Sequence, residues 1–116
     1  MFKGLSVFFE TYSITSDDNK NTALHPIEVS CDIDSSIQRT KALLTKLGYG
    51  SFVVNENFNE IFAKNEKFEV TVSFIVLQNG GTRIGVAVFS PKGKLTKKVL
   101  TGLMCEISQE FGNEKI

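Results

Sequence analysis

The stretch FEVTVSFIVLQNGGTRIGVAVF, residues 68–89, predicts the centre of the fold. Its first half alternates strictly, with one face formed by Phe68, Val70, Val72, Phe74 and Val76 and the other by Glu69, Thr71, Ser73, Ile75 and Leu77. Such a period of two is typical of a half-buried strand. Asn79-Gly80 supplies the positive dihedral angles of a tight turn. The return strand places Ile84, Val86 and Val88 on one face, so the stretch predicts an antiparallel hairpin.

Further strands are predicted on the N-terminal side of this hairpin. Residues 4–12 alternate loosely and predict a first strand, and residues 13–25 are polar and predict a surface loop. The cleanly alternating residues 27–33 predict a second strand. Short strands are expected over residues 52–55 and 60–63, separated by an Asn-rich turn.

Two amphipathic helices are predicted. Ser35 and Gln38 have the spacing of a capping box, and Gly48 suits the left-handed end of the helix that follows. The second helix runs from about residue 95 to Phe111, with one apolar stripe formed by Leu95, Val99, Leu100, Leu103, Met104, Ile107 and Phe111.

The order strand, strand, helix, four strands, helix predicts the α+β class. We expect a single domain over residues 1–116, with two layers: a mostly antiparallel sheet of about five to six strands and two helices packed on one of its faces. A length of 116 residues and a hydrophobic content of 41% suit one globular core.

Composition argues against several classes of function. Thirteen basic residues balance thirteen acidic ones, whereas nucleic-acid-binding domains usually carry a basic excess. The apolar run at the start is too short for a membrane span and lacks a cleavage site, so we expect neither a signal peptide nor a membrane anchor. Cys31 and Cys105 are far apart in apolar patterns, which favours two buried thiols in a reducing compartment over a disulfide. A cytoplasmic location is therefore expected.

The sequence offers no convincing catalytic, metal or cofactor site. His25 is the one histidine, so a histidine relay or a histidine metal site has no second imidazole. Acidic residues at Asp17, Asp18, Asp32 and Asp34 lack the glycine and closing glutamate of a calcium loop. No glycine-rich phosphate signature is present. We predict no cofactor and favour a non-enzymatic protein.

Four lysines surround the start of the second helix. Lys92, Lys94, Lys97 and Lys98 lie there, while Glu106, Glu110 and Glu114 lie at the helix end. The helix dipole favours the reverse arrangement. The free amides of a helix start beside lysines can hold an anion, although a merely solvated surface explains the same residues.

Part of the sheet face away from the helices is apolar. Phe8, Ile75, Leu77 and Phe89 are expected toward one end of that face, where contiguous apolar area usually marks an interface.

Residues 27–111 resemble a loose group of small bacterial domains of unknown function. These domains are often carried on lipoproteins and have a strand–helix–meander–helix layout similar to the TATA-binding-protein-like fold. The resemblance is carried by ALLTKLGY at residues 42–49, the strand at 68–77, NGGTR at residues 79–83 and the closing helix. The present sequence departs from the lipoprotein members because no lipid-acceptor cysteine lies near its start. The resemblance implies neither an activity nor functional residues.

Three hypotheses of function follow. The first is a binding or interaction module that acts through the exposed sheet face or a sheet edge, with a protein partner or a second copy of itself. The second is anion or nucleic-acid binding through the four lysines, which the charge balance disfavours. The third is a small-molecule or enzymatic pocket between the sheet and the helices.

Overall fold

The computed structural model describes residues 22–23, 26–55, 57–90 and 96–116. The elements in this part of the chain are β1 (Thr22–Ala23), β2 (Ile27–Val29), α2 (Ile33–Lys46), β3 (Ser51–Asn55), β4 (Glu60–Lys64), β5 (Glu69–Val76), β6 (Thr82–Phe89), α3 (Thr96–Glu110) and the short 3-10 helix η1 (Gly112–Glu114).

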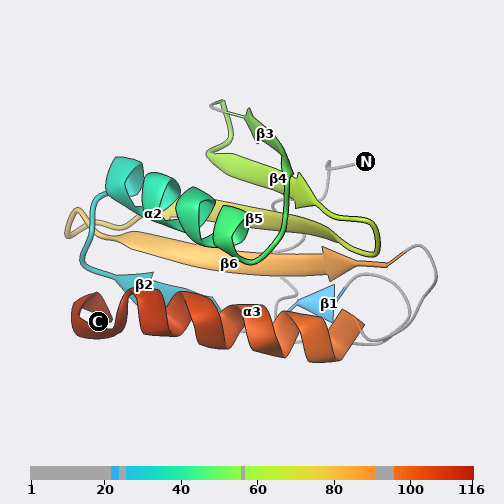
Figure 1. Cartoon of the computed structure of the whole chain (residues 1–116). Helices are drawn as coiled ribbons and strands as arrows, with labels where there is room; N and C mark the ends of the chain where they lie inside the picture. Colours follow the sequence, from blue (N-terminus) through green and yellow to red (C-terminus); the bar gives the residue numbers. More distant parts are fainter. Residues whose placement is uncertain (1–21, 24–25, 56, 91–95) are drawn as a thin grey trace.

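The strands of this described part belong to one antiparallel sheet (Figure 1). The sheet order is β1-β6-β5-β4-β3, and β2 also pairs with β6. β1 pairs with the end of β6 and β2 with its beginning, so the two short strands follow one another along the same edge. Both helices lie on one side of the sheet, which confirms the predicted two-layer α+β class.

The core lies between the helices and one face of the sheet. The register places Val70 opposite Val88, Val72 opposite Val86 and Phe74 opposite Ile84, and all six side chains are buried. α2 covers β4 and β5, whereas α3 covers β6 and β1. The large apolar side chains that are fully buried over these strands are Leu44 of α2, Leu100 and Ile107 of α3, and Phe111 just after α3.

The first helix begins earlier than predicted. Its N-cap is Asp32, whose side chain accepts a hydrogen bond from the Ser35 N–H at 2.8 Å, so the prediction of Ser35 as the cap is wrong. This hydrogen bond lowers the pKa of the Asp32 carboxyl, because it favours the ionised form. The predicted second strand is correspondingly too long, since β2 ends at Val29 and the helix begins at Ile33.

Three other predictions differ from the structure or fall outside it. The strand predicted over residues 4–12 lies outside the described residues. β1 lies within residues 13–25, a segment that was predicted as loop. In the hairpin turn Gly80 has a positive φ of 90°, while Asn79 instead accepts a hydrogen bond from the Gly81 N–H through its side chain.

The two cysteines are free thiols. Cys31 is partly buried and Cys105 is exposed on α3, so burial is wrong for Cys105. None of the helices in the described residues has the length and apolarity required to cross a membrane.

Candidate interaction surface

The C-terminal residues close the part of one sheet edge that β2 forms. The Ser30 N–H donates to the Glu114 carbonyl at 2.7 Å, and the Ile116 N–H donates to the Glu28 carbonyl at 2.9 Å. Between them Val29 forms an antiparallel bridge with Lys115. The last residues of the chain therefore satisfy backbone groups along the outer side of β2.

The opposite edge, formed by β3, is open in the described part of the chain, where β3 pairs with β4 and with no other strand. An edge strand presents unpaired N–H and C=O groups, and proteins usually protect such edges with charged residues or proline. β3 reads Ser-Phe-Val-Val-Asn and has neither. This edge is consequently a template on which another strand can pair.

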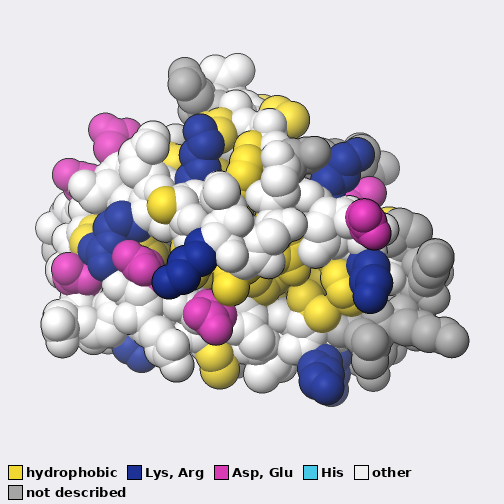
Figure 2. Space-filling model, in the orientation of Figure 1, with side chains coloured by type: hydrophobic (Ala, Val, Ile, Leu, Met, Phe, Trp, Pro, Cys, Tyr) yellow, Lys and Arg dark blue, Asp and Glu magenta, His cyan; other side chains and the backbone are white. Residues whose placement is uncertain are grey.

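Apolar side chains of β3 and β4 lie on both faces of the sheet at the open edge. Val53 is 62% exposed on the face away from the helices, beside its cross-strand partner Phe62. Phe52 and Val54 point to the opposite face, where they are half-buried against the margin of the core. Figure 2 shows hydrophobic side chains at the surface at the top of the view, where Figure 1 places β3 and β4.

The apolar residues that were predicted to lie together on the outer face are separated in the structure. Ile75 lies opposite Arg83 near the hairpin turn, whereas Phe89 lies opposite Glu69 at the other end of the same pair of strands. Ile75 is 38% exposed, and Leu77 and Phe89 are half-buried. Phe8 lies outside the described residues. Ile75 and Phe89 therefore do not share the one end of the face that was predicted for them.

A buried carboxylate lies on the outer face and was missed at the sequence level. Glu60 is 2% exposed and stands opposite Ser73, which is fully buried. Within the described residues the Ser73 hydroxyl lacks a hydrogen-bond partner, and the Glu60 carboxyl makes no ion pair. Burial raises the pKa of Glu60 above its usual value, because it penalises the ionised form.

Replacing Glu60 with glutamine should stabilise the protein at neutral pH. Burial penalises the ionised carboxylate, and replacing it with a neutral amide should raise the free energy of unfolding by about 1 kcal/mol. Between the unfolded pKa near 4.5 and the raised folded pKa, the folded state binds more protons, so wild-type stability rises as the pH falls through this window. Urea unfolding of both proteins at pH 7 measures the gain in stability from Glu60→Gln. The same measurement on the wild type at pH 5 measures how its stability changes with pH.

The exposed Glu66 provides the control for this substitution. Glu66→Gln should leave the free energy of unfolding at pH 7 unchanged, because the side chain is exposed. A Glu60→Gln protein that is less stable than wild type at pH 7 would show that the carboxylate has a stabilising role.

The predicted lysine cluster is described in part. Lys97 and Lys98 are exposed in the first turn of α3, and that turn has no acidic residue. Lys92 and Lys94 lie outside the described residues. Anion binding at this helix start stays a prediction.

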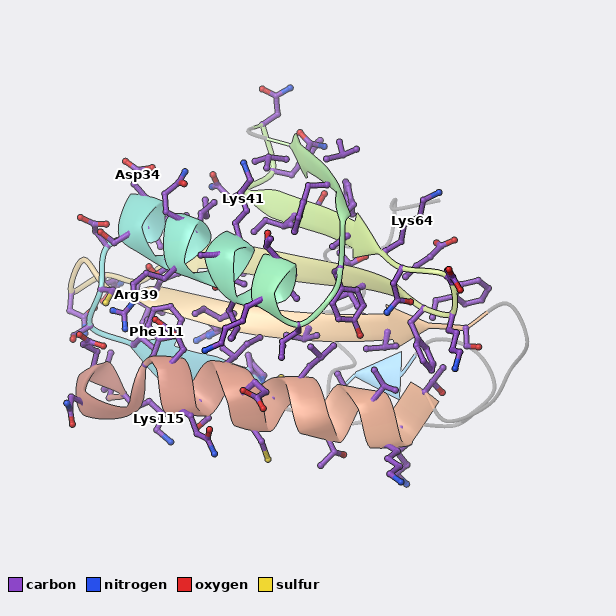
Figure 3. The ribbon with its side chains drawn as sticks, in the orientation of Figure 1. Asp34, Arg39, Lys41, Lys64, Phe111 and Lys115 are labelled. Carbon is purple, nitrogen blue, oxygen red and sulfur yellow. The ribbon has the colours of Figure 1, made fainter. Side chains whose placement is uncertain are left out.

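The acidic end of α3 is bound by an arginine of the other helix. Arg39 of α2 donates to the Glu110 carboxylate at 3.1 Å, to the Glu114 carboxylate at 3.1 Å and to the Glu110 carbonyl. Its guanidinium also lies over the Phe111 ring, 4.4 Å from the ring centre. In Figure 3 Arg39 extends from α2 toward Phe111. This cluster offsets the unfavourable charges at the helix end and joins the two helices, so we assign it a structural role.

The described residues contain no candidate metal site. No group of three or more His, Cys, Asp or Glu side chains there has the arrangement of a metal site. Asp32 serves as a helix cap, and the exposed Asp34 lies in the first turn of α2. Asp17, Asp18 and His25 are outside the described part of the chain.

Comparison of the chain with models of known protein families and with curated proteins finds no match. The resemblance to the small bacterial domains therefore stays a prediction.

Proposed function

We propose that the chain is a non-enzymatic interaction module that acts through the open edge of its sheet, and that its partner there is a second copy of the chain. The observation that carries the proposal is the difference between the two edges. The C-terminal residues hydrogen-bond along β2, whereas β3 is uncharged and open in the described part of the structure.

The composition of β3 supports strand pairing as the mode of contact. Main-chain hydrogen bonds along an exposed edge provide affinity in this mode, and alternate side chains provide specificity. Fully burying one valine removes enough apolar surface to contribute roughly 1.5–3 kcal/mol. Val53 is largely exposed, so most of that contribution is still to be gained on association.

Charge supports a second copy as the partner. The formal net charge is zero, so two copies do not repel one another at long range. No ionisable side chain lies on β3 itself, and pairing of two such strands would therefore not require a charged group of either strand to leave water.

We further propose that the module acts in the cytoplasm. Both cysteines are free, and one of them is exposed, which suits a reducing compartment.

Val53→Lys should abolish self-association. The exposed position should tolerate lysine in the monomer, but a charge at the centre of the edge strand opposes pairing. Static light scattering should show wild-type mass rising with concentration from that of one chain toward that of two, while the variant stays at the mass of one. Val76→Lys is the matched control, because Val76 is 56% exposed on β5, away from the β3 edge.

Circular dichroism should confirm that both variants are folded. A wild-type mass that stays at one chain over the whole concentration range would contradict the proposal. A loss of association caused equally by Val76→Lys would contradict the assignment to β3.

A further inference from the structure

We propose that two β3 strands pair antiparallel about a two-fold axis that passes beside Val53. This inference rests on the proposed function and specifies its interface. In this register Val53 lies opposite Val53 of the second copy, Phe52 opposite Val54, and Ser51 opposite Asn55. The result is one continuous sheet across both copies, with the same patch used by each, as a two-fold interface demands.

The side-chain alternation of β3 restricts the register. Residues opposite one another in an antiparallel pair point to the same face of the sheet. Phe52 and Val54 belong to the core face, because they pair with Ala63 and Ile61 of β4. A shift by one residue would place these side chains beside Val53 of the other copy and move its helices to the opposite face. Only even shifts keep the helices of both copies on one side.

The length of β3 selects among the registers that remain. Centring on Val53 pairs all five residues of the strand. Centring on Phe52 or on Val54 pairs three residues only and leaves the other two without a partner strand. The Val53-centred register thus satisfies the most backbone groups and covers the two exposed Val53 side chains with one another.

The position of Phe52 and Val54 at the limit of the core supports the Val53-centred register. The half-buried Phe52 and Val54 lie at the limit of the core, beyond β4 and β5 where α2 lies. Pairing Phe52 with Val54 of the second copy would join the two cores across the axis. Five residues are few beside the roughly 20–30 per partner of a standard interface, so we expect an association that reverses on dilution.

Cysteine cross-linking tests the register. In a background that carries Cys31→Ser and Cys105→Ser, Val53→Cys should form a covalent dimer in oxidised glutathione at least tenfold faster than Val76→Cys. Opposed residues place their Cβ atoms about 4.5–5.5 Å apart, close to what a disulfide requires. Phe52→Cys and Val54→Cys should each cross-link slowly alone and form the mixed dimer when combined. Circular dichroism verifies the fold of each variant.

The results distinguish a wrong register from a wrong proposed function. If the wild type associates and Val53→Lys prevents it, yet Val53→Cys cross-links no faster than Val76→Cys, the register is wrong and the open edge remains the interface. Rapid cross-linking of Phe52→Cys or Val54→Cys alone would likewise overturn the register and indicate a shift by two residues. A wild type that stays monomeric at every concentration overturns both proposals.

Discussion

Phe111→Ala should lower the free energy of unfolding by about 3–5 kcal/mol, the usual range for a fully buried phenylalanine. Phe111 is 0% exposed, and its ring lies beneath the Arg39 guanidinium. Truncation removes the ring from the core and takes away the surface on which the arginine stacks. Because small domains are stable by about 5–15 kcal/mol, the loss represents a large share of the total.

Urea unfolding measures this loss, and Phe58→Ala is its matched control. Phe58 is 60% exposed, so the same truncation there should change stability by less than about 0.5 kcal/mol. Both variants should be compared at a concentration low enough to keep the chain dissociated. A Phe111→Ala protein as stable as Phe58→Ala would contradict the position of the C-terminal residues against the core.

Gly81→Ala should destabilise the protein by roughly 2–3 kcal/mol, in the range of an overpacked site. A Cβ added at Gly81 would overlap the Val29 backbone carbonyl, which cannot turn away as a flexible side chain could. It would also crowd the Asn79 side-chain oxygen that accepts the Gly81 N–H. The hairpin turn must then move away from the end of β2.

Thermal unfolding should show the Gly81→Ala effect as a fall in Tm of about 10 °C. Gly50→Ala is the control, because a Cβ at Gly50 meets no atom within 4 Å and its φ is not positive. An unchanged Tm for Gly81→Ala would contradict the close approach of β2 to the hairpin turn.

Periodicity predicted the elements of the fold because burial imposes it directly. The strict alternation around Val72 and Val86 follows from one buried sheet face, and the stripe through Leu100 and Ile107 follows from one buried helix face. The helix start was less predictable, because Asp32 and Ser35 are both good caps three residues apart. In the structure Asp32 is the cap and accepts a hydrogen bond from the Ser35 N–H.

The candidate interface depended on contacts that a linear pattern does not contain. Which strand becomes an edge is set by long-range pairing. Here the C-terminal residues pair with β2, and among the described residues only β4 pairs with β3. Alternation assigned Ile75 and Phe89 to one face, yet only the register shows that they lie at opposite ends of it. The burial of Glu60 could not be predicted from the alternation either, because that pattern places Glu60 on the face away from the helices.

The effect of the charges at the end of α3 also depends on long-range contacts. Glutamates at its C-terminal end oppose the helix dipole when the helix is considered alone. In the structure Glu110 of α3 and Glu114 of the following η1 bind Arg39 of α2. An arrangement that is unfavourable within one helix is therefore favourable between two.

Amide hydrogen exchange of β3, measured at high and at low protein concentration, tests the open edge most directly. If β3 pairs with a second copy, the outward amides among residues 51–55 should exchange more slowly as the concentration rises, while the amides of Ser30 and Ile116, already bonded within one chain, keep their rates. Exchange of β3 at one rate over the whole range, in a protein that stays folded, would contradict self-association through this edge.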